Sequence, residues 1–387
     1  MVLGCLRSGR QFRTRDVTGS NQLVKTATPE QQAEFFRKLQ LLLTEGDYVS
    51  SYKYALLIAL ARWAVENPDH EDSEPLDIGA VAPHFTELYW PHVLPFRAGS
   101  GLATVAEPAA DAAPWGWQSI LVQDRGQQMP RVLKLIREHQ RSGCSRVSQL
   151  PEVSRSALLR QVRSAILAMP LWRLHRVRGS DDPVRFLYRR GPRSSQIRFE
   201  DGMVACLAAF APLIEEIVRS AWLRFVVRCN PGVLGAVSQV EEFLFPGSRA
   251  GLEVWRKALQ EVQGDTCFYC QQPMRQVSAV DHFLPWSRYP RDLGHNFVLA
   301  HPKCNEGKSN HLASCEQLAR WCARNHRDGE ELAWRFDKAG LPHDWPTLRR
   351  VAGSLYQMAA ACRAMVWQPG SGLVPLSADW QQVLAAS

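Results

Sequence analysis

Hydrophobic and polar positions along the chain follow the spacing of α-helices over most of its length. Thr28 stands at an N-cap position with Pro29 in the first turn, so a helix is expected from there to about Gly46. The segment 203–227 is long and mostly apolar, which predicts the central helix of the N-terminal region. Further helices are expected at 50–66, 78–89, 152–167, 252–263, 314–324, 330–338 and 348–367.

Strand patterns are few and short. Apolar Val184, Phe186 and Tyr188 alternate with two arginines and a leucine, and the segments 184–190 and 196–200 flank a Gly-Pro-Arg turn. This arrangement predicts a β-hairpin. Short strands are also expected at 276–280 and 296–300, whereas residues 97–115, rich in Gly, Ala and Pro, are typical of a flexible connection.

The net charge of +8 conceals an uneven distribution. Between residues 125 and 198, sixteen arginines and one lysine stand against four acidic residues, a net charge of +13. Basic charge concentrated in one region is typical of proteins that bind polyanions. A merely solvated basic surface is the alternative. The candidates for contacts with a nucleic-acid backbone are the arginines of the predicted hairpin: Arg185, Arg189, Arg190 and Arg193.

The composition argues against a disordered or membrane-spanning chain. Apolar residues make up 45% of the 387 residues, and thirteen tryptophans are available for cores. The longest apolar stretch, 203–214, is shorter than the roughly 20 residues that a membrane helix needs. The apolar stretch among the first residues is too short for the core of a secretory signal, and the scatter of ten cysteines favours metal binding over disulfides. We expect a soluble, cytoplasmic protein of two or three folding units.

Four residues have the spacing of a structural zinc site. Cys267 and Cys270 form a C-x-x-C pair, and His301 and Cys304 form an H-x-x-C pair about thirty residues later. Three thiolates and one imidazole make a closed tetrahedral set with no position open for substrate. A segment this small is rarely stable without such a site. His301 is the least certain ligand, because three other residues are alternatives: His295, His311 and Cys315.

Polar residues with catalytic potential lie between and just after the two pairs. The strand at 276–280 is expected to present Asp281 and His282 at its end, and a helix beginning near Cys304 carries Asn305 and Lys308 on one face. A strand, a loop, a strand and a helix around one metal form the layout called ββα-metal. Histidine takes up protons near neutral pH, and one carboxylate plus one amide leave most positions of a Mg²⁺-like ion free for water and phosphate.

These residues resemble the HNH endonuclease family in its zinc-stabilised form, whose pattern is CxxC, then DH, then N, then CN and K. The resemblance implies that Asp281 and Asn305 bind a catalytic Mg²⁺ or Mn²⁺. It implies that His282 is the general base and that Asn296 holds the loop and the histidine in place. Many members have His where this chain has Asn305, and His301 replaces the commoner third cysteine.

Contacts with phosphate oxygens are expected from Lys308, and also from Arg288 or His311. The resemblance covers about fifty residues and extends to a group of stand-alone bacterial HNH proteins with a helical N-terminal region. The predicted fold class is α+β, mainly α. The expected domains are a mainly helical N-terminal domain (1–245), an HNH ββα-metal domain (246–313) and a helical C-terminal extension (314–387).

The resulting hypothesis is a metal-dependent endonuclease that hydrolyses DNA, with RNA as an open alternative substrate. Restriction, phage defence and service in a larger effector are all compatible with it. Two rival hypotheses remain. The first is a nuclease subunit of a CRISPR-type or other multi-protein complex, and the second is a catalytically silent zinc-stabilised DNA-binding protein.

Overall fold

The computed structural model describes residues 13–15, 21–23, 27–93, 96, 121–126, 129–140, 144, 147–179, 184–230, 237–245 and 252–386. The predicted connection at 97–115 lies outside these residues. The described chain divides into two compact units. Unit 1 comprises the described residues within 26–64 and 70–247, and unit 2 comprises those within 7–25, 65–69 and 248–387. The boundaries predicted at residues 245 and 313 stay predictions.

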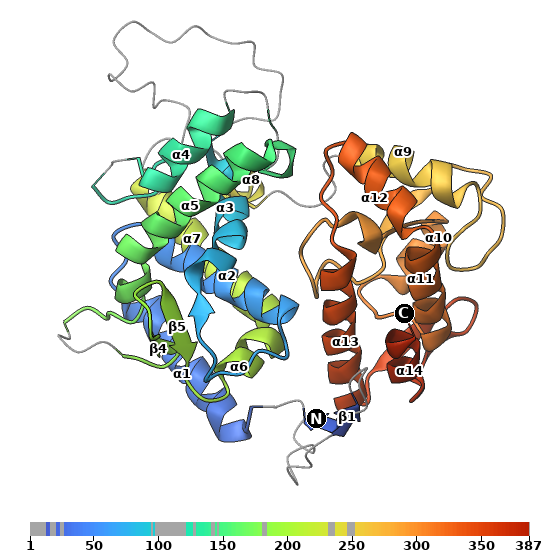
Figure 1. Cartoon of the computed structure of the whole chain (residues 1–387), viewed down its shortest axis with the longest axis horizontal. Helices are drawn as coiled ribbons and strands as arrows, with labels where there is room; N and C mark the ends of the chain where they lie inside the picture. The colour runs from blue at the N-terminus through green and yellow to red at the C-terminus, as the bar shows by residue number, and fades with distance from the viewer. Residues whose placement is uncertain are drawn as a thin grey trace, which may run out of the picture. The chain divides into compact units, whose positions relative to one another are not determined.

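Unit 1 is mainly helical, with one small sheet (Figure 1). Its helices are α1 (Pro29–Glu45), α2 (Tyr52–Glu66, whose last two residues fall in unit 2), α3 (Ala82–Tyr89), α4 (Arg131–Gln140), α5 (Glu152–Ala168), α6 (Met203–Ala209), α7 (Ala211–Cys229) and α8 (Val237–Leu244). Short 3-10 turns are η1 (Ile78–Ala80), η2 (Trp90–Val93), η4 (Val147–Gln149) and η5 (Leu171–Arg173). The predicted start of α1 is confirmed, because the Thr28 side chain accepts a hydrogen bond from the Gln31 N–H.

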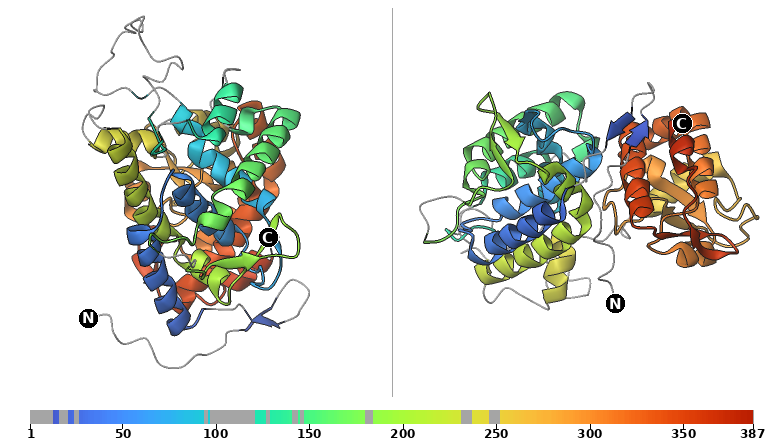
Figure 2. Two further views of the ribbon diagram at one scale, coloured as in Figure 1. Left: turned by 90° about the vertical axis from the view of Figure 1, so that its left-hand side faces the viewer. Right: turned by 90° about the horizontal axis from the view of Figure 1, so that it is seen from below.

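The central helix of unit 1 is α2 rather than the predicted helix at 203–227. Every residue of α2 from Tyr52 to Ala64 is buried. The predicted long helix is interrupted at Phe210, because Pro212 cannot donate a backbone hydrogen bond to the preceding turn. Figure 2 shows α1 running alongside α6 and the start of α7, where the Phe36 and Phe210 ring centroids lie 4.6 Å apart.

The predicted arginine-rich hairpin is present but shorter than expected. Its strands are β4 (Tyr188–Arg190) and β5 (Gln196–Phe199), paired antiparallel with Tyr188 opposite Phe199. Strand β3 (Leu76–Asp77) adds to β5, so the sheet order is β3-β5-β4 and β4 is an outer strand. Residues 184–187 are not in the strand, since the Val184 N–H donates to the His175 carbonyl instead.

In its described residues, unit 2 combines helices with three short two-stranded sheets. Its elements are β1 (Arg13–Arg15), β2 (Asn21–Leu23), α9 (Leu252–Gln263), β6 (Ala279–His282), η6 (Gly294–Asn296), β7 (Phe297–Ala300), α10 (Pro302–Lys308), α11 (Cys315–Arg327), α12 (Gly329–Lys338), α13 (Trp345–Ala361), β8 (Met365–Gln368), β9 (Gly372–Pro375) and α14 (Trp380–Ala385). Apolar residues of α9 and α12, among them Trp255 and Phe336, pack on the β6–β7 hairpin, where they share a core with Phe297. This core fixes the position of the strand that carries Asp281 and His282.

Two predictions for unit 2 are wrong in detail. The strand predicted at 276–280 lies at Ala279–His282, because pairing with β7 begins only at Ala279 and Val277 is 72% exposed. The helix predicted at 348–367 ends at Ala361. Arg363 then adopts a left-handed backbone with φ of 50°, and β8 begins at Met365.

The predicted fold class is confirmed, since the chain is mainly helical with sheets of two or three strands. Among the described residues, none of the helices has the length and apolar character required to cross a membrane.

Candidate functional site

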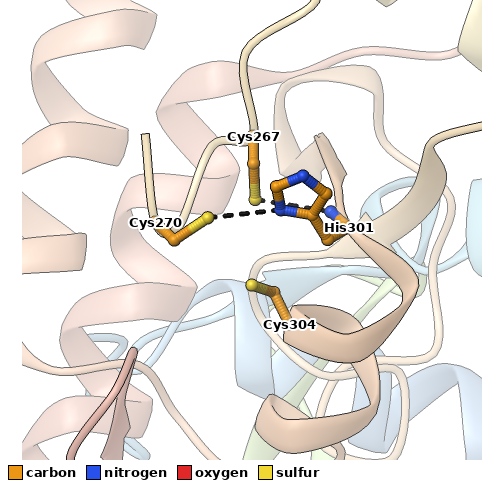
Figure 3. A group of neighbouring side chains, drawn as sticks. All are labelled: Cys267, Cys270, His301 and Cys304. Carbon is orange, nitrogen blue, oxygen red and sulfur yellow. Dashed lines mark hydrogen bonds between the residues drawn. The ribbon is translucent and has the colours of Figure 1, made fainter. Parts of the chain in front are cut away.

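The four predicted zinc ligands lie together in unit 2. Cys267 and Cys270 occupy the turn after α9, while His301 caps α10 and Cys304 lies in its first turn. Their ligand atoms all lie within 4.8 Å of one another, and Figure 3 shows the side chains around one centre. The cluster contains none of the three alternative ligands, and two of them have other contacts: His295 Nε2 contacts the Gly329 carbonyl and Cys315 Sγ contacts the Ser377 carbonyl.

The imidazole of His301 is oriented for metal binding. Its Nε2 lies 3.2 Å from the Pro273 carbonyl, and a carbonyl can only accept a hydrogen bond. The proton therefore resides on Nε2, and the lone pair of Nδ1 faces Cys270 Sγ at 3.2 Å. This pattern, a histidine fixed by a hydrogen bond on its distal nitrogen, is the one metal-ligating histidines use.

The thiols of the cluster also favour a cation. Burial and the charge of Cys267 raise the pKa of Cys304 to about 12. Burial acts in the same direction on Cys270, but hydrogen bonds from the Gln272 backbone and neighbouring side chains hold the pKa of that thiol below its usual value. Several thiolates at this spacing repel one another unless a cation lies between them. The donor set therefore fits Zn²⁺.

Asp281 lies on β6 opposite Val298 and is nearly buried. Its Oδ2 accepts a hydrogen bond from Tyr269 Oη at 2.5 Å and pairs with Lys308 Nζ at 3.0 Å. In the described part of the chain, its other carboxylate oxygen, Oδ1, has no hydrogen-bond partner. One oxygen thus anchors the side chain and the other is available for a ligand.

Lys308 is fully buried, which the sequence did not predict. Besides Asp281, its ammonium group donates to the His282 carbonyl at 2.8 Å. Burial lowers the pKa of Lys308, and the carboxylate of Asp281 opposes that shift. The predicted phosphate contact is not supported, because an ammonium group with no exposed surface and two internal partners is not free to reach a substrate. Lys308 instead fixes the position of both residues of the Asp-His pair.

Replacing Lys308 by methionine is expected to destabilise unit 2. Removal of one partner from a buried ion pair typically costs about 3 kcal/mol or more of unfolding free energy. Urea unfolding of the full chain, without added divalent metal, measures this effect. Lys303→Met is the matched control, because Lys303 is exposed on the same helix. Equal unfolding midpoints for the two variants would contradict a structural role for Lys308.

His282 is held by a carboxylate that the sequence did not single out. Its Nε2 lies 2.9 Å from Asp292 Oδ1, and its ring packs against Phe297 at 4.3 Å and Trp286 at 5.3 Å between centroids. The carboxylate accepts a hydrogen bond from Nε2–H, so the proton of the neutral ring is on Nε2 and the lone pair is on Nδ1. Within the described residues Nδ1 has no hydrogen-bond partner, so it is available as a proton acceptor.

Asn296 joins the two strands through the loop that follows His282. Its side chain accepts a hydrogen bond from the Leu284 N–H at 2.8 Å and donates to the Leu284 carbonyl at 3.0 Å. Its backbone carbonyl also accepts from the Phe283 N–H at 2.8 Å. Asn296 is fully buried, so these three bonds fix the backbone immediately after the histidine.

Asn305 lies on α10 one turn before Lys308. Residues three apart share a helix face, and the Lys308 end of that face contacts Asp281. The Asn305 side chain is half-buried, and its amide has no hydrogen-bond partner among the described residues. Asn305 therefore lies on the face of α10 whose Lys308 end contacts Asp281.

Side chains of helix α11 donate hydrogen bonds to backbone carbonyls of this site. Arg324 is buried and donates to the carbonyls of Phe297 and His295, each at 2.7 Å. Arg320 donates to the Tyr269 carbonyl at 2.8 Å, and Trp321 donates to the His295 carbonyl at 2.9 Å. The residues after 313 thus hold both the metal-binding turn and the start of β7.

The remaining candidates for phosphate contact differ in exposure. Arg288 is half-buried with its Nε 3.4 Å from the Asn310 carbonyl, and His311 is half-buried. The hairpin arginines belong to unit 1 and are all exposed: Arg185, Arg189, Arg190 and Arg193.

Comparison with known proteins agrees with this geometry. Residues 267–314 match the model of a family described as HNH endonuclease. No curated protein and no solved structure matches the chain. The segment with the Cys3His cluster, the Asp-His pair and both asparagines is therefore an HNH endonuclease domain, as the sequence predicted. A domain of this class implies a nuclease that acts on nucleic acid.

Proposed function

We propose that this protein is a metal-dependent endonuclease that hydrolyses DNA phosphodiester bonds. The observation that carries the proposal is that two neighbouring side chains are each fixed through one polar atom and keep a second polar atom free. His282 is fixed through Nε2 and leaves Nδ1 open, and Asp281 is fixed through Oδ2 and leaves Oδ1 open. Pre-oriented groups of this kind suit a hydrolytic site.

His282 acts as the general base. Its Nδ1 takes a proton from the attacking water, and Asp292 stabilises the imidazolium that forms while keeping the ring in one orientation. Asn296 keeps the following loop, and with it the histidine backbone, in place. Asp292 is a positioning residue, because it acts through His282.

Asp281 and Asn305 fit a divalent cation such as Mg²⁺ or Mn²⁺. The fit rests on the free Oδ1 of Asp281 and the free amide of Asn305, both hard oxygen donors. When bound, such an ion supplies Lewis-acid stabilisation of charge on the phosphate and the leaving oxygen. The Cys3His cluster serves as a separate, structural Zn²⁺ site.

The exposed arginines of the hairpin (Arg185, Arg189, Arg190 and Arg193), together with Arg288 in unit 2, are proposed to contact the nucleic-acid backbone. Activity in a multi-protein complex is the second candidate function, since the HNH domain alone does not determine the target. An inactive DNA-binding protein is less favoured, because binding alone needs neither an anchored histidine nor a free carboxylate oxygen.

Incubation with supercoiled plasmid tests the proposed function directly. With Mg²⁺ or Mn²⁺ the protein is expected to convert supercoiled plasmid to the nicked form first, because one HNH site cuts one strand. Absence of cutting with either ion, for protein that binds the plasmid, would favour the inactive DNA-binding alternative. If the purified protein does not cut but the complex isolated from its native cells does, the protein is a nuclease subunit that needs partners.

Asp292→Asn is expected to slow cleavage at least about tenfold, because the imidazolium loses its counter-charge and its fixed orientation. Binding of DNA should be unchanged, so kcat falls while KM does not. Asp337→Asn is the matched control, since it breaks an exposed His–Asp contact with His343 in the same unit. Equal rates for the two variants would show that Asp292 has no part in the reaction.

A further inference from the structure

A cleft of about 350 Å³ in unit 1 is lined mainly by arginines and aromatic residues. It lies where η5 meets the outer strand β4, and its volume falls in the range of small-molecule sites. It has no role in the HNH chemistry proposed above. Its polar and aromatic lining residues are Trp172, His175, Arg185, Tyr188, Arg189 and Arg190.

Three arginines give this cleft a concentrated positive charge. Arg185, Arg189 and Arg190 line it without any acidic residue in the lining. Within the described part of the chain, none of the three forms an ion pair with a carboxylate. Guanidinium groups that line one cleft repel one another, and their planar donor sets match phosphate oxygens. The cleft is therefore suited to a phosphate group.

The cleft also has aromatic lining residues, Trp172 and Tyr188. The Arg190 guanidinium lies 4.9 Å from the centre of the Trp172 ring, and Tyr188 is fixed by a hydrogen bond of 2.6 Å from its hydroxyl to the Leu171 carbonyl. Trp172 is only half-buried. Indole and guanidinium planes are the surfaces on which nucleobases stack.

His175 contributes shape rather than charge. Burial and the nearby Arg185 lower its pKa to about 4, so the ring is neutral at pH 7. Its Nε2 accepts a hydrogen bond from the Leu187 N–H at 3.4 Å, which ties η5 to the segment leading into β4. The positive charge of the cleft thus comes from the three arginines alone.

We propose that this cleft binds a single nucleotide, with the phosphate on Arg185, Arg189 and Arg190 and the base stacked beside Trp172. The proposal goes beyond the endonuclease activity and does not depend on it. It also differs from a diffuse basic surface, because it involves the three arginines of the lining and not Arg193 of the same hairpin. The nucleotide has two possible sources: a free nucleotide, or the phosphorylated end of a nucleic-acid strand.

Isothermal titration of the full chain with AMP, adenosine and inorganic phosphate tests the ligand class. The measurement needs no divalent metal and no cleavage. AMP is expected to bind at least about tenfold more tightly than either fragment, since it engages both halves of the cleft. Equal affinity for AMP and inorganic phosphate, or no heat from AMP with folded protein, overturns the proposal.

Substitutions then test the location. Arg189→Ala is expected to weaken AMP binding about tenfold, whereas Arg193→Ala, an equal loss of charge at an exposed hairpin position outside the lining, leaves it unchanged. Trp172→Ala should also weaken it about tenfold, and Trp172→Phe should retain most of the affinity. Equal losses for Arg189→Ala and Arg193→Ala overturn the proposal, even if Trp172→Ala disturbs folding.

Competition against a fluorescent AMP analogue distinguishes the two sources. A short single strand carrying a 5′-phosphate that displaces the analogue, when its 5′-hydroxyl counterpart does not, identifies a strand end as the ligand. Displacement by free AMP alone identifies a free nucleotide. Displacement by both strands equally means that the cleft recognises backbone charge only, which overturns the proposal.

Discussion

His282→Ala is expected to reduce plasmid cleavage by about 10²–10⁴-fold while leaving the fold intact. Nδ1 of His282 is the proposed proton acceptor for the attacking water, and Asp292 and the packed rings of Phe297 and Trp286 keep it in position. Alanine removes the base without adding a charge or a clash. Initial nicking rates at saturating Mg²⁺ measure the effect.

His326→Ala provides the matched control, because His326 is exposed on α11 and the substitution is chemically identical. It should cut at the wild-type rate. Circular dichroism and thermal unfolding of both variants separate lost chemistry from lost structure. Cleavage by folded His282→Ala at the wild-type rate would falsify the assignment of His282 as base.

Loss of the structural metal is expected to have the largest effect on stability. Structural zinc contributes about 10–16 kcal/mol of binding free energy in small zinc-finger peptides. The Cys3His cluster joins the turn after α9 to the start of α10, and α10 carries Asn305 and Lys308. Cys267→Ser should therefore lower the zinc content from one per chain and lower the unfolding midpoint of unit 2.

Cys362→Ser is the control for that experiment, since Cys362 is exposed and distant in sequence from the cluster. It should keep one zinc per chain, measured by elemental analysis, and the wild-type unfolding curve. A Cys267→Ser protein with undiminished zinc and an unchanged midpoint would mean that the cluster holds no structural metal.

The sequence was most informative where the structure depends on neighbours along the chain. The C-x-x-C and H-x-x-C pairs form the predicted cluster, because each pair is local and only the meeting of the two pairs is long-range. Thr28 as N-cap, with Pro29 after it, predicted the start of α1 for the same reason. Such local patterns can be recognised in the sequence without knowledge of the tertiary structure.

The sequence was least informative where a side chain's role depends on distant partners. Lys308 has the spacing of a surface lysine on a helix, and only the burial of its partners Asp281 and His282 makes it structural. Asp292 is one of several charged residues in a polar loop, and no spacing rule connects it with His282. The cleft beside Trp172 requires η5 and β4 to meet, which periodicity does not predict.

A crystal structure of the His282→Ala variant with Mn²⁺ and a short DNA duplex is the most direct measurement of the central claim. The account predicts one anomalous peak bonded to Asp281 Oδ1 and to the Asn305 side-chain oxygen, at roughly 2.0–2.3 Å, with a phosphate oxygen beside it. When the wild-type chain is superposed on the variant, the imidazole of His282 should face the attacked phosphorus. Manganese bound elsewhere, with Asp281 and Asn305 pointing to separate surfaces, would contradict it.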